Sequence, residues 1–153
     1  MISRRENFRY DASGLSGVTL KNVRVSRCQA CGEWSVAIPR IDELHTAIAH
    51  AVVSKRTLLV PEEIRFLRKY LGWSGSDFAA HMGTTPESVS RWENGRLAMS
   101  LPADRALRLM VAVREPIQDY ELDRLRAITS RRTTRPLRVG LSLAKSGWTS
   151  KAA

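Results

Sequence analysis

The sequence predicts an α+β protein: a small β-rich N-terminal module joined by a helix to an all-α domain. Residues 1–39 are rich in β-forming residues, residues 40–54 change to helical spacing, and from residue 61 onward helix-starting and helix-ending residues recur. The predicted divisions are a β-rich module (1–39), a linker helix (40–57), an all-α domain (58–130) and a basic tail (131–153).

Composition indicates a binding protein with a polyanionic partner. The chain has 153 residues, 43% of them hydrophobic, with a formal net charge of +10 and a pI of about 10.6. Charge of this sign and size favours nucleic acid. The sequence contains no apolar run of membrane-spanning length and no signal-peptide pattern, so we expect a cytoplasmic protein without a membrane partner. Two cysteines do not form a disulfide framework.

The N-terminal module is expected to contain two strands. The stretch from Val18 to Val25 alternates in part, and residues 34–38 form a second β-like run that Pro39 ends. From residue 40 to about residue 54, apolar residues recur at intervals of three and four, as in a helix that is apolar on one face.

Helix boundaries are marked clearly in the middle of the chain. Pro61 followed by two glutamates starts one helix, which Gly72 ends. Ser74 is the N-cap candidate of a helix at about 75–82, and Thr85 caps the next, which runs to about residue 94. Helices are also expected from Pro102 to before Pro116 and at about 117–129, whereas residues 137–143 fit either a short strand or a disordered arm.

Residues 75–95 have the spacing of a helix-turn-helix. Ala79 is small enough for a second helix to cross closely, and Gly83 stands where the turn needs a positive φ. Val89 and Trp92 lie three residues apart, so they can pack together onto the first helix. The other face is then free to enter a DNA major groove, although an ordinary helical hairpin would share this pattern.

The second of these helices supplies the candidates for base readout. Arg91 is the strongest, because guanidinium pairs bidentately with guanine. Ser88 and Ser90 fit contacts to bases or phosphates, and Thr85 lies at the helix entry. Glu87 fits either a contact to cytosine or a first-turn acid that only favours the helix dipole. The candidates for phosphate contacts are Lys69, Ser74, Gly75, Ser76 and Arg96.

Two nested resemblances follow from these residues. Residues 61–113, above all Val89-Ser-Arg-Trp-Glu-Asn-Gly95, resemble XRE-type helix-turn-helix domains. Residues 7–113 resemble YgiT/MqsA-type antitoxins through a short set of motifs: Phe8-Arg-Tyr, Gly17-Val-Thr-Leu-Lys, Cys28-x-x-Cys-Gly-Glu33, Ile38-Pro-Arg-Ile-Asp-Glu-Leu-His45 and Pro61-Glu-Glu-Ile-Arg-Phe-Leu-Arg-Lys69.

The resemblance implies a zinc-binding N-terminal module, a C-terminal DNA-binding domain, a partner toxin and autorepression of an operon by homodimers. The XRE likeness further implies that Arg68 and Glu93 bridge two helices and act structurally. It also places Gly75 where such domains carry a DNA-contacting glutamine, so Ser74, Ser76 or backbone amides would have to substitute for it.

The cysteines depart from the family pattern. The family's zinc site uses two Cys-x-x-Cys pairs, and the first pair is missing here, which leaves Cys28 and Cys31 as the candidate metal ligands. Structural zinc needs four ligands, and nothing in the spacing of His45, His50 or His81 requires them to complete the site. We therefore expect a turn held by packing and no bound cofactor, with zinc as the alternative.

These observations lead to one expected function and one alternative. We expect a sequence-specific repressor that is the antitoxin of a type II toxin–antitoxin pair and binds a palindromic operator in double-stranded DNA as a homodimer. The alternative is a stand-alone XRE-like regulator without a toxin. The sequence lacks paired carboxylates, a nucleophile elbow, a phosphate-binding loop and a complete metal triad, so we do not expect an enzyme.

Two further questions stay open at the level of sequence. The apolar residues of the helix after Pro102 fit either a dimer seam or the domain's own core; they are Leu101, Leu107, Met110 and Val111. The basic residues of the tail fit a DNA-tracking arm, a solvated tail or a toxin-binding segment; they are Arg131, Arg132, Arg135, Arg138 and Lys145.

Overall fold

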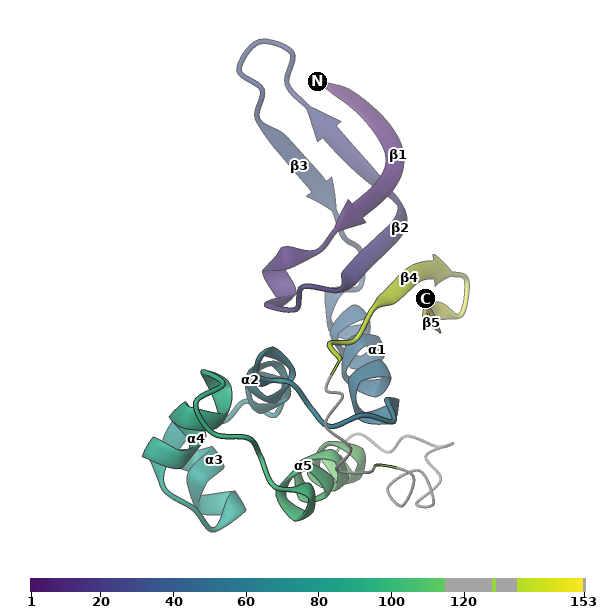
Figure 1. Ribbon diagram of the computed structural model, residues 1–153. Coiled ribbons are helices and arrows are strands. Elements are labelled where there is room, and N and C mark those ends of the chain that lie inside the picture. The colour runs from purple at the N-terminus through teal and green to yellow at the C-terminus, as the bar shows by residue number, and fades with distance from the viewer. Residues whose placement is uncertain (115–127, 129–134, 153) are drawn as a thin grey trace. The chain divides into compact units, whose positions relative to one another are not determined.

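The computed structural model describes residues 1–114, 128 and 135–152, and it confirms the α+β class (Figure 1). The chain divides into two compact units. The first combines Met1–Ile48 with Arg138–Ala153, and the second is Ala49–Leu137. Among the described residues, no helix has the length and apolar character needed to cross a membrane.

The first unit is built on a five-stranded sheet. Its strands are β1 (Ile2–Arg9), β2 (Val18–Arg27), β3 (Trp34–Ala37), β4 (Val139–Ala144) and β5 (Gly147–Ala152), with a short 3-10 turn at Asp11–Ser13. Strand β1 pairs along most of β2. Strand β3 pairs with the last four residues of β2, and β4 pairs with the first four residues of β2. Strands β3 and β4 therefore share the second edge of β2, and β5 pairs with β4.

Strand β2 supplies much of the core of this unit. Val18, Leu20, Val23 and Val25 are all buried, although strict alternation would bury residues of one parity only. The parity changes at Asn22, whose φ of 56° interrupts the extended backbone where the pairing with β1 also shifts register. This irregularity explains why the sequence alternates only in part.

Two strands of the sheet differ from the sequence-based expectation. Strand β1 was not expected, because it is polar and mostly exposed; it is held by backbone pairing with β2 rather than by burial. For residues 137–143 the sequence allowed either a short strand or a disordered arm, and most of them form β4.

The predicted division at residue 131 does not coincide with the units of the structure. From Arg138 onward the chain belongs to the sheet unit, so Arg138 and Lys145 do not lie on a free basic arm. Arg131 and Arg132, like most of the helix predicted at 117–129, lie outside the described residues.

Helix α1 (Ile41–Ser54) lies where the linker helix was expected, and four further helices follow among the described residues of the second unit. These are α2 (Pro61–Tyr70), α3 (Gly75–Met82), α4 (Pro86–Glu93) and α5 (Leu101–Arg114). Their core includes Ile64, Leu67, Phe78, Leu107 and Val111, all at most 2% exposed. Leu107 and Val111 therefore belong to the domain core, so for these two residues of α5 the structure favours a core role over a dimer seam.

A buried ionic cluster ties the segment before α2 to α5. Arg108 is fully buried, and its Nε donates to Asp104 Oδ1 at 2.6 Å while its Nη atoms donate to the carbonyls of Val53, Lys55 and Thr57. Asp104 Oδ2 in turn accepts from the amide of Leu59 at 2.7 Å. Since every guanidinium nitrogen has an acceptor, the cost of burying this charge is offset by hydrogen bonds.

Replacing Arg108 with Met should destabilise the second unit strongly. The change leaves Asp104 buried without its charge partner and removes the hydrogen bonds that Arg108 donates to three carbonyls, which typically costs about 3–5 kcal/mol. Urea unfolding would measure the loss, with Val113→Ala on the same helix as the control, because that side chain is 74% exposed. If the two variants unfolded at the same urea concentration, the cluster would not have this stabilising role.

Candidate nucleic-acid interface

Helices α3 and α4 are each set by local capping, as the sequence predicted. Ser74 Oγ accepts from the amide of Asp77 at 3.1 Å, and Asp77 Oδ2 accepts from the amide of Ser74 at 2.9 Å, which completes a capping box. Thr85 Oγ1 accepts from the amide of Ser88 at 3.2 Å. Between the helices, Gly83 has a φ of +63°. Glycine adopts this left-handed conformation without steric cost, which explains its place in the turn.

The inner face of α4 packs on α3 through apolar side chains. Val89 is 2% exposed and Trp92 8%, and α4 contacts α3, whose Phe78 and Ala79 are also buried. The rings of Phe78 and Trp92 meet edge to face with centroids 6.3 Å apart. The predicted packing of a helix-turn-helix is therefore confirmed by the structure.

An ion pair fastens the end of α4 to α2. Arg68 donates two hydrogen bonds to the Glu93 carboxylate, at 2.5 and 3.0 Å, and a third to the carbonyl of Trp73. The bond to Glu93 raises the pKa of Arg68. On the same helix, Arg65 donates to the Glu93 carbonyl at 2.7 Å and to Asn94 Oδ1. The structure confirms the predicted structural pair and adds Arg65, which the sequence did not indicate.

The outer face of α4 carries the predicted base-reading residues. Thr85, Glu87, Ser90 and Arg91 are exposed, and Ser88 is half-buried. Among the described residues, no hydrogen bond or ion pair engages the Arg91 guanidinium, whereas Ser90 Oγ accepts from Asn94 Nδ2 at 3.3 Å. Arg91 is thus the base-reading candidate whose donors are all available to a ligand.

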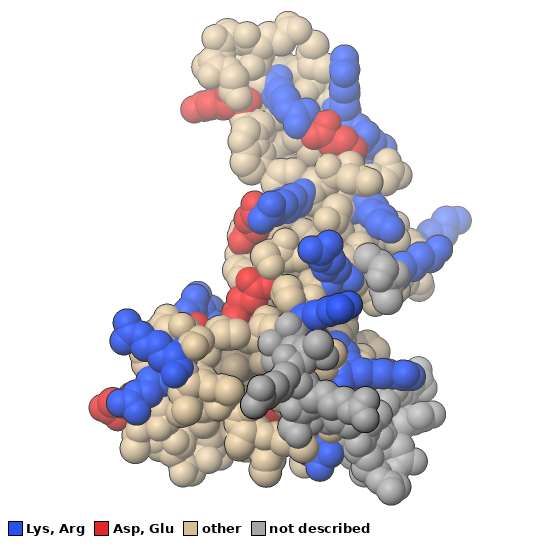
Figure 2. Space-filling model, in the orientation of Figure 1, with Lys and Arg blue, Asp and Glu red and all other residues tan. Residues whose placement is uncertain are grey.

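The phosphate candidates lie around the same two helices. Ser76, Lys69 and Arg96 are exposed and Gly75 is half-buried at the start of α3. The Ser74 hydroxyl already accepts from the amide of Asp77 and donates to its carboxylate, so it is the least available of the set. In Figure 2, basic side chains stand on the surface of the region that holds α3 and α4 in Figure 1. Their contacts with phosphate stay predictions.

The Cys28 and Cys31 thiols lie in the loop between β2 and β3. The amide of Gly32 donates to the Cys28 carbonyl at 3.0 Å, and backbone hydrogen bonds from Cys31 and Ala30 lower the pKa of the Cys28 thiol. Two of the histidines have other partners: His45 bonds to the Tyr10 hydroxyl and His81 stacks on Trp73.

The donor set around these thiols does not fit structural zinc, which takes four ligands. Within the described ranges, no group of three or more His, Cys, Asp or Glu side chains is placed to hold a metal ion. Cys28 and Cys31 supply half of the set, and the chain has no other cysteine.

Residues 64–113 match the helix-turn-helix family model. This region is a DNA-binding helix-turn-helix domain of the XRE type. The match covers the end of α2 that holds Arg68, both helices of the motif and nearly all of α5. No curated protein and no solved structure matches the chain.

Protein purified without chelators should contain well under one zinc ion per chain, because two thiolates alone do not hold structural zinc firmly. Plasma mass spectrometry on a protein sample of known concentration would measure this, with Cys31→Ser as the control for metal bound elsewhere. A stoichiometric value that disappears in Cys31→Ser would contradict this account of the cysteines.

Proposed function

We propose that the protein is a sequence-specific transcriptional repressor that binds a palindromic operator through α4. The observation that carries the proposal is the Arg91 guanidinium, which is exposed and without a partner among the described residues on the face opposite Val89 and Trp92. A helix oriented in this way can enter the major groove with its outer residues at the base edges.

Recognition would divide between two groups of residues. Arg91 would pair bidentately with a guanine, with Ser90, Ser88 and Glu87 at neighbouring base edges. Lys69, Ser76 and Arg96 would contact phosphates and fix the register of the domain on the duplex without contributing to sequence preference. One such domain covers few base pairs, so a homodimer on half-sites about 34 Å apart, or a multiple of this, would supply affinity.

Replacing Arg91 with Ala should reduce sequence preference while leaving the fold intact. Losing one bidentate pair reduces discrimination between operator and random duplex by about 1–3 kcal/mol, or roughly 5- to 150-fold. Fluorescence anisotropy on both duplexes, with the circular dichroism of each variant, would measure the effect.

Lys69→Ala is the matched control, since it removes the same charge from a predicted phosphate contact. It should weaken binding to both duplexes equally and reduce the slope of log affinity against log salt by about 1. An Arg91→Ala variant that behaved like Lys69→Ala would contradict base readout by Arg91.

We further propose that this repressor is the antitoxin of a type II toxin–antitoxin pair, acting in the cytoplasm by binding rather than by catalysis. The order of its modules and the motifs it shares with YgiT/MqsA-type antitoxins support this role. The missing Cys-x-x-Cys pair favours the alternative of a stand-alone XRE-like regulator, because it alters the module in which such antitoxins bind zinc. Expression together with an adjacent small reading frame distinguishes the two: the antitoxin role requires a stable complex and protection from growth arrest.

A further inference from the structure

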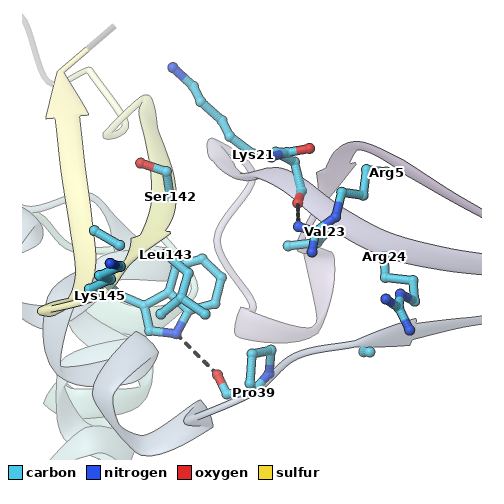
Figure 3. A pocket seen from close by; sticks show the side chains of 12 residues that line it. Arg5, Lys21, Val23, Arg24, Pro39, Ser142, Leu143 and Lys145 are labelled. Carbon is cyan, nitrogen blue, oxygen red and sulfur yellow. Dashed lines mark hydrogen bonds between the residues drawn. The ribbon is translucent and has the colours of Figure 1, made fainter.

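The sheet unit contains a basic pocket that the proposed DNA-binding role does not use. Its volume is about 520 Å³, and it opens between the β1–β2 region and the β4–β5 hairpin (Figure 3). Arg5 and Arg24 lie on one side of it in this view, and Ser142, Leu143 and Lys145 lie on the other. This volume is within the range of small-molecule sites.

Four basic side chains and no acidic one line this pocket. They are Arg5, Lys21, Arg24 and Lys145, and all four are exposed. In the part of the chain that the structure describes, none of them forms an ion pair with a carboxylate, and Arg5 donates only to the carbonyl of Asn22. Four unneutralised cations around one hollow create a positive potential that attracts an anion.

The side chain of Lys21 lies across a glycine of β4. The space that a Cβ of residue 140 would take is occupied by the end of the Lys21 side chain, so Gly140 leaves room for it there. The parallel pairing of β2 with β4 brings the two residues together, although they are more than a hundred positions apart in the chain. This pairing places the backbone of Lys21 at the edge of the pocket, where its exposed side chain is available to a ligand.

Part of the remaining wall of the pocket is apolar, beside the polar residues Asn22 and Ser142. Trp148 and Pro39 line it together with Val23 and Leu143. The indole Nε1 of Trp148 already donates to the Pro39 carbonyl at 3.1 Å, so the ring contributes carbon surface and no free donor (Figure 3). A ligand that fits this wall has an apolar or aromatic part in addition to its charge.

We propose that this pocket binds a small phosphate-bearing molecule with an aromatic body, of about the size of a nucleotide. Arginine and lysine side chains bind phosphate groups through charge-assisted hydrogen bonds, and the apolar part of the wall accommodates the ring. A DNA duplex also presents phosphates, but it is too wide to enter a hollow of about 520 Å³. The proposal is independent of the DNA-binding role of α4.

Isothermal titration of the full-length protein with ADP, pyrophosphate and adenosine tests the proposal. We expect saturable 1:1 binding of ADP, weaker binding of pyrophosphate and little or none of adenosine, because the charge supplies most of the attraction. Lys21→Ala and Lys145→Ala should each weaken ADP binding about tenfold, as expected for one charged hydrogen bond.

Arg4→Ala is the matched control. Arg4 precedes Arg5 on β1, so its side chain points to the other face of the strand, and it does not line the pocket. Circular dichroism would verify folding; if Lys21→Ala did not fold, Lys145→Ala at the β4–β5 turn would carry the test. Unchanged ADP affinity in Arg4→Ala supports the pocket.

Three results would overturn the proposal. One is the absence of saturable ADP and pyrophosphate binding. A second is an equal loss of affinity in Arg4→Ala and Lys145→Ala, which would indicate diffuse charge rather than a site. The third is a Lys21→Ala variant that keeps its ADP affinity but binds random duplex DNA more weakly, which would assign the lysine to DNA.

Discussion

The orientation of α4 depends on the ion pair between Arg68 and Glu93 together with the burial of Val89 and Trp92. A helix of eight residues is not stable by itself, so its position is fixed by what holds it. The apolar pair fixes which face of α4 points inward, and the two bonds from Arg68 fix its C-terminal end against α2. Arg91 is exposed as a consequence, since at about 3.6 residues per turn it lies roughly 100° around the helix from Trp92 and roughly 160° from Val89.

Arginines in this protein have different roles because their surroundings differ. Arg108 is fully buried and every polar atom of its guanidinium is paired, so it acts on stability alone. Arg68 is largely buried and bound to Glu93, so its role is to fix the position of α4. Arg91 is exposed and has no partner in the described residues, which leaves its donors for a ligand. Net charge therefore indicates the class of partner, and burial decides which cations can contact it.

Local signals made the helix-turn-helix predictable from sequence. Ser74, Gly83 and Thr85 act within a few residues of themselves, and each has the capping or turn role that the sequence indicated. The sheet was harder to predict because its pairing is long-range. Strand β1 is polar, and β4 is recognisable only through its pairing with β2 far earlier in the chain. The basic pocket was missed for the same reason: that Lys21 and Lys145 line one pocket is known only once the pairing of β2 with β4 is known.

Sequence-specific recognition of DNA by the outer face of α4 can be tested by selecting bound duplexes from random DNA with the whole chain. We expect enrichment of a palindrome whose half-sites each contain a guanine that Arg91→Ala no longer selects. Recovery of duplexes without any shared sequence, at normal affinity and with a folded protein, would contradict it.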